Sequence, residues 1–179
     1  ITHVLLTHIH LDHAGAAGWM ASQGAMICVH PVGAPHMMDP EKLLRSAQRI
    51  YGEEMDRLWG EFLPVPQAHL AVLHDGDQLN LGGLKITAHA PPRHAEHHHS
   101  YLLEDVCFTG DIGGVRIPGY PYLRVPMPPP ELHFQKWRES IARLQALKVR
   151  RIAPTHFGIF DDPAWHLKEL AAVLAATER

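Results

Sequence analysis

The sequence has few cysteines, no long apolar run and no excess of basic residues. Its 179 residues include two cysteines, Cys28 and Cys107, and both lie within apolar stretches. Two buried thiols do not make a disulfide framework and are typical of a reducing compartment, so we predict a cytoplasmic protein. No apolar stretch approaches the roughly 18 residues that a membrane-spanning helix needs, so we expect no membrane partner.

The charge balance argues against a nucleic-acid partner. The formal net charge is −3, whereas nucleic-acid binders usually carry a clustered basic face. The compact basic stretch formed by Lys148, Arg150 and Arg151 adjoins an expected strand, and we interpret it as a solvated rim. We therefore predict a small-molecule substrate, no nucleic-acid partner, and a chain that can form a homo-oligomer.

Apolar periodicity predicts alternating strands and helices along one domain over residues 1–179. The expected strands are 1–7, 25–30, 70–73, 79–89, 100–109 and 151–154, and the expected helices are 14–22, 40–62, 131–147 and 163–177. The Pro- and Gly-rich segment 112–130 is expected to form a functional loop. This alternation predicts an α/β fold. Because Ile1 stands inside an expected strand, we also predict that an N-terminal segment precedes it.

The 16 histidines are unevenly distributed, and four ligand-type residues stand within six positions: His8, His10, Asp12 and His13. In an extended segment, residues two apart point the same way, so His8 and His10 can bind one metal ion together. Asp12 and His13 follow as the chain turns toward a small-residue helix, and can face a second ion. Imidazole and carboxylate ligands suit zinc, and thiolate is not required.

The segment His-Ile-His-Leu-Asp-His at positions 8–13 resembles the first signature of the metallo-β-lactamase superfamily. Three later segments resemble further motifs of that family in the expected order: 91–98 with His94, 108–111 with Asp111, and 153–158 with His156. The resemblance covers nearly the whole chain. It implies a four-layer αββα sandwich that lacks some N-terminal strands. Arg93 departs from the family pattern, which has glycine before the third-motif histidine.

The resemblance also implies a ligand set for two divalent ions, zinc first and iron or manganese as alternatives. One ion takes His8, His10 and His94, the other takes Asp12, His13 and His156, and Asp111 bridges the two. His97, His98 and His99 are interpreted as surface residues or as residues behind the ligands, with His98 the best placed to hydrogen-bond near the metals. The remaining histidines are interpreted as structural.

These residues predict a dinuclear metal-dependent hydrolase that uses a metal-bridging hydroxide, with Asp12 and Asp111 as catalytic residues. The predicted substrate is a small ester, thioester or lactone. The resemblance to true β-lactamases weakens at Asp111, which they generally lack. The alternatives are a phosphodiesterase of the same fold, a mononuclear iron sulfur dioxygenase, and a metal-binding module without catalysis.

Overall fold

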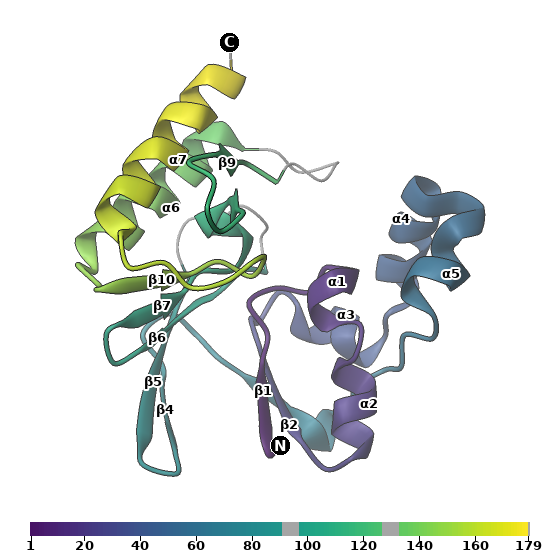
Figure 1. Ribbon diagram of the computed structural model, residues 1–179. Coiled ribbons are helices and arrows are strands. Elements are labelled where there is room, and N and C mark those ends of the chain that lie inside the picture. The colour runs from purple at the N-terminus through teal and green to yellow at the C-terminus, as the bar shows by residue number, and fades with distance from the viewer. Residues whose placement is uncertain (91–96, 127–132, 179) are drawn as a thin grey trace. The chain divides into compact units, whose positions relative to one another are not determined.

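A computed structural model of the chain describes residues 1–90, 97–126 and 133–178, which form two compact units. The first unit comprises Ile1–Leu73, and the second begins at His74. Each unit has its own β-sheet with helices packed against it (Figure 1). None of the helices in the described ranges combines the length and the apolar character that crossing a bilayer requires.

The first unit is built on three parallel strands in the order β1-β2-β3. Its core joins the buried strand residues Ile27 and Val29 to small helix residues such as Ala14 and Ala17. Between β1 and β2 the chain forms two short α-helices, and between β2 and β3 it forms three α-helices and two short 3-10 helices. The elements are β1 (His3–Leu5), α1 (Leu11–Ala14), α2 (Ala17–Ser22), β2 (Met26–Val29), α3 (Ala34–Met38), α4 (Glu41–Tyr51), η1 (Gly52–Glu54), α5 (Met55–Trp59), η2 (Gln67–His69) and β3 (Leu70–Val72).

Two expected helices of this unit are divided. The helix expected over 14–22 is two helices, α1 and α2, and α1 begins early enough to contain Asp12 and His13. The helix expected over 40–62 ends at Gly52, whose φ of +53° is outside the α-helical region, and resumes as α5. The change of direction breaks the expected apolar stripe, so Ile50 and Leu58 are about half exposed.

The second unit is built on a five-stranded sheet in the order β10-β7-β6-β5-β4, in which β10 and β7 are parallel and the other pairs are antiparallel. The runs expected at 79–89 and 100–109 each form a hairpin of two strands. The segment 112–130, expected as a loop, contains a short ladder of two strands within its described part. The elements are β4 (Gln78–Leu81), β5 (Leu84–His89), β6 (Ser100–Leu103), β7 (Val106–Phe108), η3 (Gly110–Gly113), β8 (Val115–Arg116), β9 (Leu123–Arg124), α6 (Phe134–Ala146), β10 (Arg151–Ala153) and α7 (Pro163–Thr177).

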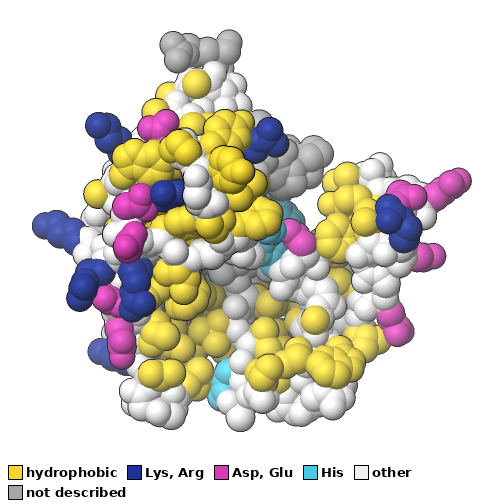
Figure 2. Space-filling model, viewed as in Figure 1, with side chains coloured by type: hydrophobic (Ala, Val, Ile, Leu, Met, Phe, Trp, Pro, Cys, Tyr) yellow, Lys and Arg dark blue, Asp and Glu magenta, His cyan; other side chains and the backbone are white. Residues whose placement is uncertain are grey.

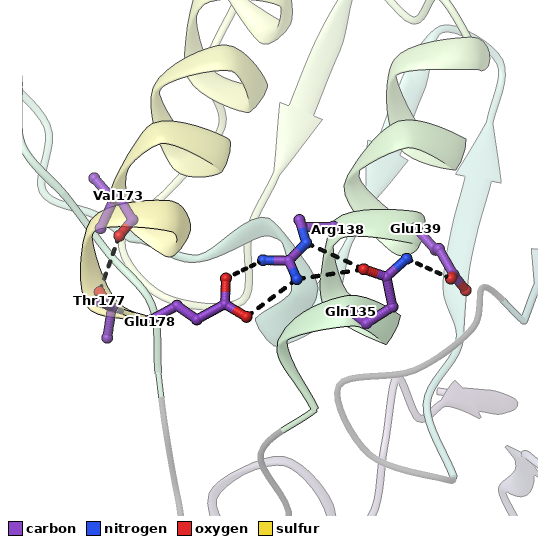
Figure 3. A network of polar contacts seen from close by, with 6 residues as sticks. All are labelled: Gln135, Arg138, Glu139, Val173, Thr177 and Glu178. Atoms are coloured by element: carbon purple, nitrogen blue, oxygen red, sulfur yellow. Dashed lines mark hydrogen bonds and ion pairs between the residues drawn. The ribbon is translucent and has the colours of Figure 1, made fainter.

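Helices α6 and α7 lie side by side and cover this sheet (Figure 1). Trp137 and Ile141 of α6 and Leu170 of α7 pack with Cys107 and Ile152 of the strands. The first part of α6 is linked to the residue that follows α7: the Arg138 guanidinium donates hydrogen bonds to both carboxylate oxygens of Glu178 (Figure 3). This contact raises the pKa of Arg138 and lowers that of Glu178, but the pair is exposed to solvent and adds little to stability.

The basic stretch of this unit forms a solvated rim, as predicted. The side chain of Arg150 is 85% exposed, and Arg150 and Arg151 both pair with the Asp105 carboxylate at distances of 3.7 and 2.8 Å. On the face shown in Figure 2, Lys and Arg side chains stand among Asp and Glu side chains over this unit. The cationic groups of this rim are therefore partly neutralised by their neighbours.

Candidate metal centre

The first group of candidate ligands follows strand β1. Leu5 ends the strand, Leu6 N–H still donates to the Cys28 carbonyl of β2 at 2.9 Å, and His8 stands three positions beyond Leu5. The chain then enters α1, whose first turn is closed by the N–H groups of His13 and Ala14 on the His10 carbonyl. This local path brings His8, His10, Asp12 and His13 to the same end of the strand.

Small residues behind this loop allow the backbone to pack closely. A Cβ on Gly18 would lie 2.0 Å from the carbonyl oxygen of Leu63, so only glycine fits there. Ala14 and Ala17 are buried against the same core. Close packing of the backbone therefore fixes where α1 lies and, with it, Asp12 and His13.

The donor atoms of this first group lie close together. His8 Nε2 is 2.9 Å from His10 Nδ1, His13 Nε2 is 3.1 Å from Asp12 Oδ2, and the rings of His8 and His13 have centroids 3.9 Å apart. Two ligands that share one tetrahedral zinc ion at bond lengths of 2.0–2.1 Å stand about 3.4 Å apart. The separations and the imidazole–carboxylate chemistry both fit a metal ion.

The second group follows the parallel pair β7 and β10. Ala153 lies opposite Phe108 in the register, and the ladder continues with a hydrogen bond of 3.0 Å from Thr109 N–H to the Ala153 carbonyl. Asp111 and His156 each stand three positions beyond these strand ends. Parallel strands end at the same edge of a sheet, so the two side chains meet there: His156 Nε2 is 3.6 Å from Asp111 Oδ1.

The second group also fits a metal ion. The Asp111 side chain is only 6% exposed, whereas that of His156 is 33% exposed. A buried carboxylate is costly unless it is paired or coordinates a metal, and an imidazole with one accessible edge can complete such a site. His94, the third-motif histidine, lies outside the described residues.

The interpretation of His98 and His99 as possible surface residues is wrong. Both are fully buried, directly before Ser100 of β6. Because β6 is antiparallel to β7, with Tyr101 opposite Phe108, the start of β6 lies at the sheet edge where β7 ends. The run that follows them, Ser100–Leu103, could have suggested this burial, since the histidines lead directly into an expected buried strand. The antiparallel pairing of β6 with β7, which brings these histidines to that edge, can be seen only in the tertiary structure.

Other histidines have the structural contacts that were assumed for them. His30 is buried and its Nδ1 accepts a hydrogen bond from Val32 N–H at 3.1 Å. The Nδ1 of His69 contacts the carbonyl oxygen of Ala25 at 3.2 Å, and the Nε2 of His166 contacts that of Gly113 at 2.7 Å. These rings hold backbone groups of their own units.

A family model described as the metallo-beta-lactamase superfamily matches residues 1–156 of the chain. The chain belongs to the metallo-beta-lactamase superfamily. The superfamily includes metal-dependent hydrolases and typically binds metal ions, and the prediction of the family from the four ordered motifs is confirmed.

Relatives within the metallo-beta-lactamase superfamily match most of the chain. A metallo-beta-lactamase fold-containing protein of Sulfurisphaera tokodaii is 26% identical over 95% of this chain and 66% of its own length. An atrochrysone carboxyl ACP thioesterase of Aspergillus fumigatus is 27% identical over 90% of this chain and 40% of its own length. The chain thus spans less than two thirds of each of these curated relatives.

A solved structure confirms the metallo-beta-lactamase fold. The crystal structure of an archaeal metallo-beta-lactamase superfamily protein from Sulfolobus tokodaii matches with a TM-score of 0.81 and 26% identity. The match covers 96% of this chain and 67% of the solved chain. The predicted α/β class is therefore confirmed, and the structural neighbour is of the sandwich type that the motifs implied.

Proposed function

We propose that this chain is the catalytic region of a dinuclear metal-dependent hydrolase that acts on a small thioester, ester or lactone. The observation that carries the proposal is that candidate ligands gather at strand ends in both units, with donor atoms 2.9–3.6 Å apart. Membership of a superfamily that includes metal-dependent hydrolases supports the same conclusion.

The proposed ligands are the set that the family resemblance implies. His8, His10 and His94 would hold one ion, Asp12, His13 and His156 would hold the other, and Asp111 would serve as a further carboxylate ligand. Zinc is the first choice because the set contains only imidazoles and carboxylates, which are common zinc ligands. Iron and manganese accept the same ligands and remain the alternatives.

The two aspartates have different surroundings, which supports different roles. Asp111 is nearly buried, so its carboxylate would suit a fixed ligand position. The side chain of Asp12 is 41% exposed and lies beside His13, so it can accept a proton from an attacking water and pass it on. Bound divalent ions would supply acidification of that water and polarisation of the substrate's carbonyl oxygen.

A thioester is the preferred substrate within the proposed set. The fungal relative that matches 90% of this chain is an atrochrysone carboxyl ACP thioesterase. A thioester, an ester and a lactone all present a carbonyl carbon to water and develop negative charge on the carbonyl oxygen. One site that stabilises this charge therefore serves all three.

The test is a hydrolysis panel on the zinc-loaded protein. The substrates are an acyl thioester, a lactone, an aryl ester and a phosphodiester, and the variant is Asp111→Asn. The matched control is Asp105→Asn, because Asp105 is an acid of the same unit whose carboxylate pairs with the rim arginines Arg150 and Arg151. We expect turnover of the thioester that Asp111→Asn abolishes and Asp105→Asn preserves.

The other outcomes each contradict part of the proposal. Turnover of the phosphodiester alone would replace it with a phosphodiesterase. Full activity in Asp111→Asn would overturn the dinuclear mechanism. Zinc binding without turnover of any substrate would favour the metal-binding module, and oxygen uptake with a persulfide substrate by the iron-loaded protein would favour the sulfur dioxygenase.

A further inference from the structure

The short turn η3, which carries Asp111, is held by ring N–H groups from two helices. Trp137 of α6 donates from Nε1 to the carbonyl oxygen of Ile112 at 3.1 Å. His166 of α7 contacts the carbonyl oxygen of Gly113 through Nε2 at 2.7 Å. A carbonyl only accepts, so the His166 Nε2 must carry the proton. Both side chains are fully buried.

These contacts provide hydrogen-bond donors for the carbonyls of the turn. The carbonyl of Asp111 itself accepts from Gly114 N–H at 2.9 Å. Three successive carbonyls, those of Asp111, Ile112 and Gly113, therefore each have a donor: one within the turn and two from the helices that cover the sheet. A buried carbonyl without a donor would be costly, so the two rings and the turn fit together as one arrangement.

Contacts from outside the turn are needed to fix its conformation, because its own glycines allow many backbone dihedral angles. Gly110 begins the turn and Gly114 follows it, with φ values of +57° and +72°, and glycine at these two positions allows the residues between them many backbone conformations. A Cβ on Gly113 would lie 2.0 Å from Thr109 Oγ1, so the turn also packs tightly on the residue before it. Packing and the two ring donors together therefore stabilise one backbone conformation of the turn.

We propose that Trp137 and His166 are positioning residues that hold the η3 turn through the carbonyls of Ile112 and Gly113 and thereby fix the Asp111 carboxylate. Neither ring is among the candidate ligands; they act on the backbone that presents the ligand. The consequence for metal binding rests on the proposed function. The proposed restraint on the turn does not, because the two hydrogen bonds involve only groups of the chain itself.

The first experiment measures hydrogen exchange of the Gly114 amide in the metal-free protein. The variants are Trp137→Phe, which removes the indole N–H, His166→Leu, which removes the ring donor, and His166→Gln, which keeps an N–H donor. The matched control is Leu174→Ala, a buried residue of α7 two helical turns beyond His166. The Ile152 amide, bonded to the Phe160 carbonyl at 2.9 Å, reports general loss of stability.

We expect Gly114 exchange to be about 10-fold faster in Trp137→Phe and His166→Leu relative to Ile152, and close to wild type in His166→Gln. We expect Leu174→Ala to change both amides alike. Unchanged relative protection of Gly114 in both donor-removing variants would overturn the proposal. So would a relative loss that Leu174→Ala reproduces.

The second experiment measures the affinity of the same variants for zinc by competition with a chromogenic chelator. Residues that orient a ligand typically change metal affinity by about 10-fold or more, so we expect that loss in His166→Leu and recovery in His166→Gln. Faster Gly114 exchange with wild-type affinity would show that the turn does not position Asp111. If the wild-type protein binds no zinc, the proposed function fails, while the exchange result still decides whether the rings hold the turn.

Discussion

The Nε2 atom of His156 lies 3.6 Å from Oδ1 of Asp111, although 45 positions separate them along the chain. The relationship follows from the parallel register of β7 and β10, which aligns Phe108 with Ala153. Each side chain stands three positions past its strand, so equal offsets from aligned strand ends bring the two together. His8 stands at the same offset beyond β1 in the other unit.

Removal of the His156 imidazole should halve the metal content. The proposed second ion depends on His156, whereas the first does not, so His156→Ala should bind about one zinc per chain where the wild type binds about two. Elemental analysis after gel filtration measures this ratio. The control is His69→Ala, because His69 contacts the Ala25 carbonyl and is not a proposed ligand. Equal zinc content in His156→Ala and wild type would contradict the assignment.

Gly18→Ala should destabilise the chain. The added Cβ would meet the Leu63 carbonyl oxygen at 2.0 Å, and backbone cannot move away cheaply. Overpacking of this kind costs about 1–3 kcal/mol, which outweighs the better helix propensity of alanine. Urea denaturation of the metal-free protein measures the free energy of unfolding. Ser22→Ala, at the exposed end of the same helix, should change it by less than about 0.5 kcal/mol; a similar loss there would remove the steric explanation.

Burial of His166 should make stability fall toward acidic pH. Burial lowers the pKa of this ring, the nearby Arg116 acts in the same direction, and the Gly113 hydrogen bond and Asp162 oppose it. The unfolded chain then binds a proton that the folded chain does not, so stability is lost as the pH falls below about 6.5 and through the folded pKa. The advantage of wild type over His166→Gln should shrink between about pH 8 and about pH 5 in urea denaturation. A constant difference would contradict this linkage.

The two thiols should be inert in the folded protein. Burial raises the pKa of Cys28 to about 11 and that of Cys107 to about 12, and both side chains are almost completely inaccessible. Because the thiolate is the reacting form, an aromatic disulfide reagent at mildly alkaline pH should modify neither cysteine in the native state and both in denaturant. Rapid reaction of either thiol with the native chain would show that its strand opens readily.

Local patterns in the sequence predict much of this fold because they depend on neighbouring residues alone. Helix α7 has the predicted bounds, and the strands at 25–30 and 151–154 match β2 and β10 within about two residues. The helix expected over 40–62 is interrupted at Gly52, because the positive φ of this residue is incompatible with an α-helix even though the apolar periodicity continues. The segments 79–89 and 100–109, each expected as a single strand, are hairpins, because the chain reverses between β4 and β5 and between β6 and β7.

The sequence by itself determined the family: the spacing of His8, His10, Asp12 and His13 and the order of the later motifs point to the superfamily that the family model confirms. Tertiary structure alone decided that Asp111 meets His156, that His98 and His99 are buried, and that the ring N–H groups of Trp137 and His166 reach the η3 turn. The physical reason is register. Spacing along one segment is visible in the sequence, whereas the alignment of strands and helices far apart in the chain is set only when the core packs.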